Sequence, residues 1–141
     1  MPFVCFKRLG ERRVYSPRSY AKSFEKILRV GHCISACWLV RRKALGSVGL
    51  LDENIFYAPE DIDYCLQMWL SGWEVLYVPF ARVLHYTQRS SYKSFRMAWL
   101  HGKGLFFFFR KHKYLLSRKN LYKKIIRAVK QHGIQQPEGL N

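Results

Sequence analysis

The chain has 141 residues, of which 25 are Lys or Arg and only nine are Asp or Glu, giving a formal net charge of +16. This length fits one domain, and a hydrophobic content of 49% predicts a folded core and excludes a disordered coil. The charge predicts an anionic partner, with nucleic acid, an acidic membrane surface and phosphorylated small molecules all open. The longest apolar block, 105–109, is far shorter than the roughly 20 residues needed to cross a bilayer.

The first third of the chain predicts an irregular start followed by one buried strand. Residues 1–29 are basic and broken by Gly, Pro and Ser, with room for one short helix over 20–28. Residues 1–9 lack the uninterrupted apolar core of a signal peptide. The run Cys33–Val40 is apolar except for Ser35, which predicts a strand buried on both faces, although a short helix would give the same pattern.

The four cysteines form no CxxC pair, so we expect reduced structural thiols and a cytoplasmic protein. The next expected element is a short helix over 43–48, which Gly49 ends by taking a left-handed conformation. A longer helix is expected from about Glu60 to Leu70, because Pro59 and the acids after it are typical of a helix start. Strands are expected over 73–78 and 82–86.

The last third of the chain is expected to form basic amphipathic helices rich in aromatic residues, over 91–131, followed by a loose tail over 132–141. Such helices are typical of proteins that lie on an anionic membrane surface. Any one cation could equally be a solvated charge. The candidates for binding a membrane or a phosphate group are Arg89, Lys93, Arg96, Arg110 and Lys111.

Five of the nine acids lie between Asp52 and Asp63, and Glu60 and Asp61 are adjacent at the expected helix start. An ionised carboxylate in such a place can act as a general base toward a hydroxyl. It can equally serve only to cap the helix, and the same alternative applies to Asp63. His85 follows an apolar stretch, where an imidazole could bind a divalent metal or a phosphate, or simply make a hydrogen bond.

Several motifs in a fixed order give a more specific indication. Together they resemble family 2 glycosyltransferases of the rhamnosyltransferase-like kind, over roughly 30–112. The motifs are Ser35-Ala36-Cys37-Trp38-Leu39-Val40-Arg41-Arg42-Lys43-Ala44-Leu45, Val48-Gly49-Leu50-Leu51-Asp52-Glu53, Glu60-Asp61-Ile62-Asp63-Tyr64-Cys65-Leu66, Gly72-Trp73, Val78-Pro79, Val83-Leu84-His85 and Phe107-Phe108-Phe109-Arg110-Lys111-His112.

The resemblance implies an α/β protein with part of a GT-A fold: 30–90 would be the C-terminal, acceptor-side half of the mixed sheet. It implies transfer of a sugar, with inversion, from a nucleotide-sugar donor to a hydroxyl of a glycan or a lipid-linked acceptor. A divalent cation, Mg²⁺ or Mn²⁺, would bind the donor diphosphate. Asp61 would be the base, and His85 would lie near the diphosphate or metal. The acceptor would contact Glu60, Asp63, Trp38 and Trp73.

The chain also departs from the family. Ser35 and Leu50 stand where relatives usually have Gly, and Gln67 stands where they usually have Arg. No nucleotide-binding half with an Asp-x-Asp metal motif precedes 30, so we expect a truncated or split enzyme that is inactive alone, works with a separate N-terminal half, and lies on the inner face of the cell membrane.

Two other classes of function stay open. One is a basic module that binds a membrane surface or nucleic acid without catalysis. Nucleic acid is the weaker option, because most aromatics follow core patterns and no RNA-binding or helix-turn-helix signature is present. The other is a structural remnant that folds only with a partner.

Overall fold

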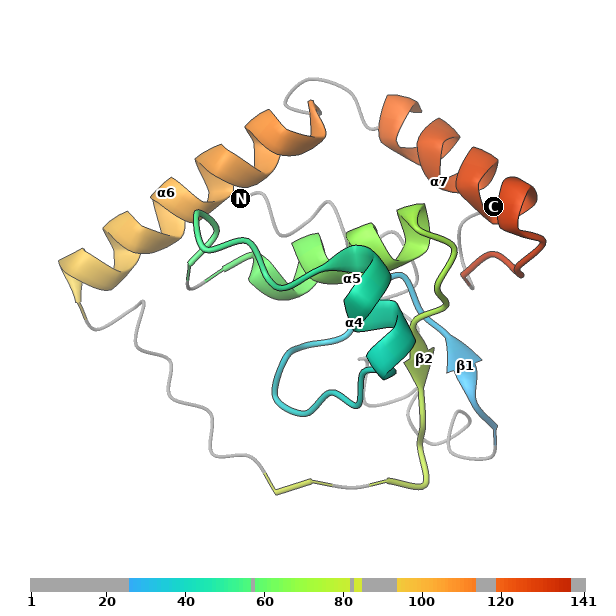
Figure 1. The fold of residues 1–141 in the computed structure, drawn as a ribbon. Helices are drawn as coiled ribbons and strands as arrows, with labels where there is room; N and C mark the ends of the chain where they lie inside the picture. The colour runs from blue at the N-terminus through green and yellow to red at the C-terminus, as the bar shows by residue number, and fades with distance from the viewer. Residues whose placement is uncertain (1–25, 57, 82, 85–93, 114–118, 138–141) are drawn as a thin grey trace.

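The computed structural model of the chain describes residues 26–56, 58–81, 83–84, 94–113 and 119–137. Helices and a small sheet both occur, which confirms the mixed α/β class (Figure 1). In chain order, the elements of the described residues are β1 (Leu28–Arg29), α4 (Arg42–Val48), α5 (Glu60–Leu70), β2 (Leu76–Tyr77), α6 (Phe95–His112) and α7 (Lys119–His132).

The sheet consists of β1 and β2, which pair antiparallel with Leu28 opposite Tyr77. The Val30 N–H extends this pairing by donating to the Val75 carbonyl at 2.9 Å. The strand expected over 73–78 is therefore present but shorter. The helix expected over 20–28 lies mostly outside the described residues, and its last residue, Leu28, begins β1 instead.

Helix α5 is the centre of the fold, and its bounds confirm the predicted ones. Three acids lie in its first turn, where the positive end of the helix dipole favours them. Its apolar face is buried, and Trp69, only 1% exposed, donates from Nε1 to the Val30 carbonyl at 3.1 Å. This bond fixes α5 to the end of β1. The buried apolar residues of α5 are Ile62, Tyr64, Cys65, Leu66, Met68 and Trp69.

Helix α4 ends as expected at Gly49, whose φ of 87° lies in the region that glycine tolerates best. The Gly49 carbonyl accepts a hydrogen bond of 2.8 Å from the Tyr64 hydroxyl. The end of α4 is thus held against the middle of α5.

The strand predicted over Cys33–Val40 is wrong, as is its burial. No strand forms there, and Ile34, Leu39 and Val40 are exposed. Within the described residues the ladder forms between β1 and β2, so this run has no strand partner to bury it. Of the second strand expected over 82–86, Val83 and Leu84 are described and are not in a strand, and the remainder lies outside the described residues.

The basic helices predicted in the last third are confirmed as α6 and α7, which lie at an angle to each other on one side of α5 (Figure 1). Helix α7 buries Leu121, Ile125 and Val129 in the same hydrophobic core as α5. Helix α6 approaches the segment before α5 so closely that a Cβ on Gly104 would overlap the Ala58 carbonyl oxygen. Both helices therefore pack on the core through one face.

Candidate functional site

The acids at the start of α5 fall into two environments. Asp63 is buried, with 1% of its surface exposed, whereas Glu60 and Asp61 are partly exposed. The sequence motif places all three within one helical turn, but only the structure separates them. Asp61 and Glu60 are the acids that a substrate could reach.

Asp63 is held by donors from two helices. Its Oδ1 lies 2.6 Å from His112 Nε2, and its Oδ2 lies 2.9 Å from Lys111 Nζ and 2.6 Å from Gln67 Nε2. A buried carboxylate with this many donors is well satisfied. These contacts give Asp63 a part in holding α6 against α5, and its contribution to the acceptor side stays a prediction.

Lys111 joins two acids that are eleven positions apart. Its Nζ contacts Asp63 and also Asp52 Oδ2 at 2.8 Å. Burial alone would lower the pKa of Lys111, but its hydrogen bonds to Asp52 and Asp63 outweigh burial and raise it. The hydrogen bond from Lys111 in turn lowers the pKa of Asp52. Lys111 was predicted to bind a membrane or a phosphate group, but its ammonium group forms ion pairs with two acids of the same chain.

This pairing also bears on Gln67, one of the positions where the chain departs from the motifs that it resembles. Gln67 donates to Asp63, and Lys111 supplies the positive charge from another helix. This network gives no local signal in the sequence, because its partners lie 48 and 49 residues apart. The only available signal was the Arg-Lys-His segment at the end of the aromatic run.

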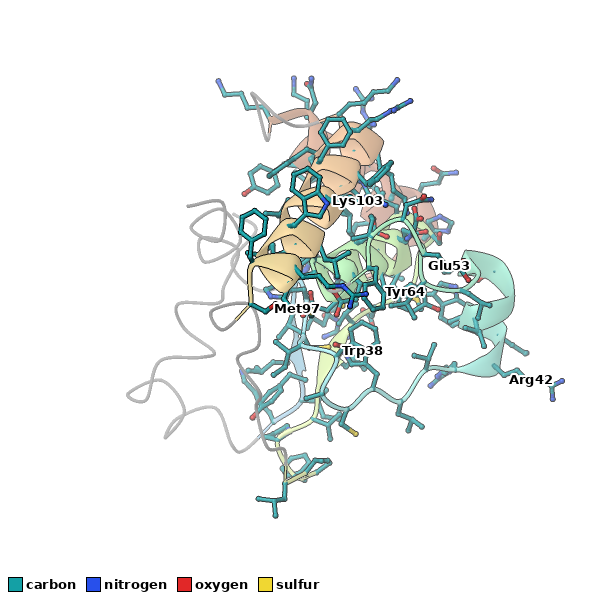
Figure 2. The ribbon with its side chains drawn as sticks, turned by 90° about the vertical axis from the view of Figure 1, so that its left-hand side faces the viewer. Trp38, Arg42, Glu53, Tyr64, Met97 and Lys103 are labelled. Atoms are coloured by element: carbon teal, nitrogen blue, oxygen red, sulfur yellow. The ribbon has the colours of Figure 1, made fainter. Side chains whose placement is uncertain are left out.

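Two buried polar atoms near the N-terminal end of α5 have no hydrogen-bond partner with good geometry within the described residues, although the Cys33 thiol lies beside one of them, on Trp38. They are Trp38 Nε1, a donor, and Glu60 Oε2, an acceptor. Both belong to one corner of the molecule, because Ser35 hydrogen-bonds to Glu60 while the Trp38 ring stacks on Tyr64, one turn further along α5. The two rings are 5.8 Å apart with an interplanar angle of 19° (Figure 2). Unsatisfied buried groups are rare, so this corner suits a polar ligand.

Glu60 is further marked by its ionisation. Burial raises the pKa of Glu60, and the charge of Asp61 adds to this effect. Asp61 accepts a 2.7 Å hydrogen bond at Oδ1 from the backbone N–H of Ile62. A partly exposed carboxylate fixed to a rigid helix start can take a proton from a bound hydroxyl.

A pair of thiols lies beside this corner. Cys33, Cys37 and Cys65 are free, as expected, and Cys65 Sγ lies 3.8 Å from the Cys33 carbonyl oxygen. The hydrogen bond with Cys65 outweighs burial and lowers the pKa of Cys33, while the pKa of Cys65 is raised. Sequence spacing gave no indication that these two thiols meet.

The other predicted site residues lie apart from Asp61 or outside the described residues. Trp73 follows the far end of α5, about 16 Å along an 11-residue helix, and donates to Ser47 Oγ at 2.8 Å. Arg96 and Arg110 are exposed on α6. His85, Arg89 and Lys93 lie outside the described residues.

Neither a metal centre nor a membrane span is found in the part of the chain that the structure describes. No three His, Cys, Asp or Glu side chains there are placed to hold a metal ion. None of the described helices combines the length and apolar character needed to cross a bilayer.

Comparison with known proteins links the chain to rhamnosyltransferases. It is 44% identical over 62 residues to the N-acetylglucosaminyl-diphospho-decaprenol L-rhamnosyltransferase of two Mycobacterium tuberculosis strains, CDC 1551 / Oshkosh and H37Rv, a match covering 44% of this chain and 20% of those proteins. It is 33% identical over 92 residues to Rhamnosyltransferase WbbL of Escherichia coli K12, covering 64% of this chain and 34% of that protein.

The chain thus spans about a third or less of the length of these curated relatives. No protein-family model matches the chain, and no solved structure does. The partial similarities support a glycosyltransferase-like origin, in agreement with the resemblance seen in the motifs.

Proposed function

We propose that this chain is the acceptor-side portion of a family 2 glycosyltransferase with a partial GT-A fold. The whole enzyme would transfer a sugar, a hexosyl group such as rhamnose, from a nucleotide-sugar donor to an acceptor hydroxyl, with inversion. The similarity to rhamnosyltransferases supports the reaction class. One of these relatives is named for a diphospho-decaprenol acceptor, which supports a lipid-linked glycan as acceptor here.

The observation that carries the proposal is the contrast among the acids of α5. Asp63 is buried and bound by three donors, while Asp61 is partly exposed at the helix start. In the proposed mechanism Asp61 takes the proton from the acceptor hydroxyl as that oxygen attacks the anomeric carbon of the sugar, and the bond from this carbon to the diphosphate breaks so that the nucleoside diphosphate leaves. Glu60 would bind the acceptor through its unpartnered Oε2, and Trp38 through an indole N–H that otherwise lies beside the Cys33 thiol.

The remaining parts of the reaction are proposed to come from elsewhere. We place the nucleotide-binding function on a separate N-terminal half, since the chain matches only a fraction of its relatives. The divalent cation also stays a proposal, with His85 as its candidate ligand, and no step here depends on it. The net charge of +16 supports a position at the inner face of the cell membrane.

The test is a transfer assay with a panel of nucleotide sugars, Mg²⁺ or Mn²⁺, and a short-chain diphospholipid-linked N-acetylglucosamine as acceptor. The isolated chain should show no turnover, and adding the donor-binding half of the Escherichia coli relative should restore it. Asp61→Asn should abolish the restored turnover, whereas Glu53→Gln, at an exposed acid nearby, should keep it. Turnover that Asp61→Asn leaves unchanged would remove Asp61 as the base.

A further inference from the structure

Helix α6 displays a row of aromatic side chains to solvent. Phe95 is 88% exposed, Trp99 is 68% exposed and Phe106 is 62% exposed. At 100° per residue, these three positions fall within about 40° of one another around the helix. They therefore form one continuous stripe, which we call the aromatic stripe of α6.

The stripe is not the side of α6 that stabilises the fold. Gly104, Phe108 and His112 are buried and lie on the opposite side of the helix, against the Ala58 carbonyl and Asp63. Because these contacts fix the rotation of α6, the aromatic stripe is held outward. Burial of large aromatic surface is strongly favourable, so an exposed row of this kind marks an interaction surface.

Cations flank the stripe along one side. Three of them are exposed: Arg96, Lys103 and Arg110. They lie about 60–100° around the helix axis from Phe95. Figure 2 shows Lys103 along the ribbon of α6. No acid occurs between positions 94 and 113. The surface therefore combines aromatic rings with positive charge, and its partner must be both apolar and anionic.

These properties decide between candidate partners. A second copy of the chain would bring two rows of like charge together, which is unfavourable. The rest of a GT-A sheet would add through backbone hydrogen bonds at β1 or β2, and the outer face of a helix offers none. Helix α7 provides an internal comparison, because its exposed side carries Lys123, Lys124 and Arg127 without exposed aromatics.

We propose that the aromatic stripe of α6, with its flanking cations, binds the surface of an anionic lipid bilayer. Aromatic rings insert at the level of the lipid headgroups, and Lys and Arg pair with anionic headgroups. Helix α6 would lie in the interface, consistent with its lacking the apolar character of a span. Lys111 takes no part, because it is bound to Asp52 and Asp63.

This docking deepens the proposed transfer to a lipid-linked acceptor and rests on it. The inner side of α6 contacts the segment before α5 through Gly104 and the first turn of α5 through His112. One helix therefore connects the lipid-binding stripe to the turn that carries Asp61. Docking of α6 would bring Asp61 near the height of the headgroups, where the sugar of a lipid-linked acceptor lies.

The test uses the whole 141-residue chain and vesicles of phosphatidylcholine with about 30% phosphatidylglycerol. Sedimentation measures binding, and brominated lipids report which Trp enters the bilayer by quenching its fluorescence. We compare Phe106→Ser with the matched control Phe80→Ser, since Phe80 is 64% exposed but lies outside α6. Trp99→Phe keeps an aromatic ring while removing the reporter.

We expect binding that weakens as salt rises and that Phe106→Ser lowers at least about tenfold while Phe80→Ser does not. Bromolipid quenching should be present in the native chain and largely lost in Trp99→Phe. The Asp61→Asn variant should bind vesicles as the native chain does, although it should not support sugar transfer. The two measurements therefore distinguish a failure of the proposed function from a failure of docking. The proposal would be overturned if the chain did not bind vesicles or if the fluorescence of Trp99 were not quenched. It would also be overturned if the chain formed a dimer that Phe106→Ser dissociates, and the partner of the stripe would then be a second copy of the chain.

Discussion

Asp63 Oδ1 lies 2.6 Å from His112 Nε2, which joins the first turn of α5 to the last turn of α6. Both side chains are nearly inaccessible to solvent, at 2% and 6%. A contact between such buried groups replaces hydration with one fixed geometry. It holds α6 in place beside the acids that form the candidate site.

Removing the Asp63 carboxylate should therefore destabilise the fold strongly. Asp63→Ala leaves His112 and Lys111 without this partner, and loss of one member of a buried pair typically costs about 3–5 kcal/mol. We expect a loss near the lower end, because Lys111 keeps Asp52. The measurement is urea denaturation followed by circular dichroism.

Asp52→Ala is the matched control for this prediction. It removes the other, more exposed acid bound to the same Lys111 Nζ, and such pairs contribute about 1 kcal/mol or less. Equal losses in the two variants would contradict the assignment of Asp63 as the contact that joins α5 to α6.

Two glycines of α6 predict opposite changes in stability. A Cβ on Gly104 would overlap the Ala58 carbonyl oxygen, so Gly104→Ala should cost about 1–3 kcal/mol through overpacking. A Cβ on Gly102 meets nothing within 4 Å, so Gly102→Ala should stabilise the exposed helix by about 0.5–1 kcal/mol. Thermal unfolding of both variants measures the contrast. Destabilisation by both would show that helix propensity does not govern the outer side of α6.

The sequence predicted elements whose signals are local. Pro59 and the acids after it defined the start of α5, and Gly49 defined the end of α4. The strand predicted over Cys33–Val40 was wrong, because an apolar pattern indicates hydrophobicity but not whether a partner strand is present. The contact of Asp63 with His112 spans 49 residues, so no local pattern could reveal it.

The ionisation of Glu60 predicts a dependence of stability on pH. Burial raises its pKa in the folded chain above the ordinary value of 4.5, so the folded state binds the proton more tightly than the unfolded state. Stability from this group is fully present below the unfolded pKa and is lost as pH rises through the folded pKa. Glu60→Gln stays neutral, so its stability relative to the native chain should rise between about pH 4 and pH 7.

Because Glu60 is only partly buried, solvent screening should limit this difference to about 1 kcal/mol or less. Denaturant unfolding at several pH values measures it, and Glu53→Gln, at an exposed acid, corrects for the general effect of removing one carboxyl. If the stability of Glu60→Gln relative to the native chain fell with rising pH, the sign would be opposite to that expected. Burial would then be excluded as the cause of a raised pKa of Glu60.

Two tryptophans have buried indole N–H groups, and we expect one of them to affect stability and the other to affect acceptor binding. Trp69 Nε1 donates to the Val30 carbonyl, whereas Trp38 Nε1 has only the Cys33 thiol, a weak acceptor, beside it. Trp69→Phe should therefore leave a buried carbonyl unpaired, at a cost of about 1–3 kcal/mol beyond the loss of ring area. Trp38→Phe should cost about 1 kcal/mol or less, because the stack on Tyr64 is kept.

The corresponding effect of Trp38→Phe should appear in the transfer reaction. If the indole N–H binds the acceptor, its loss removes one hydrogen bond and should raise KM for the acceptor by about three- to tenfold with kcat nearly unchanged. The assay is the one that restores turnover with a donor-binding half, with denaturant unfolding run in parallel on the same protein. An unchanged KM in a stably folded Trp38→Phe variant would remove Trp38 from the acceptor site. Glu60 Oε2 would then be the buried unpartnered atom that remains at this site among the described residues.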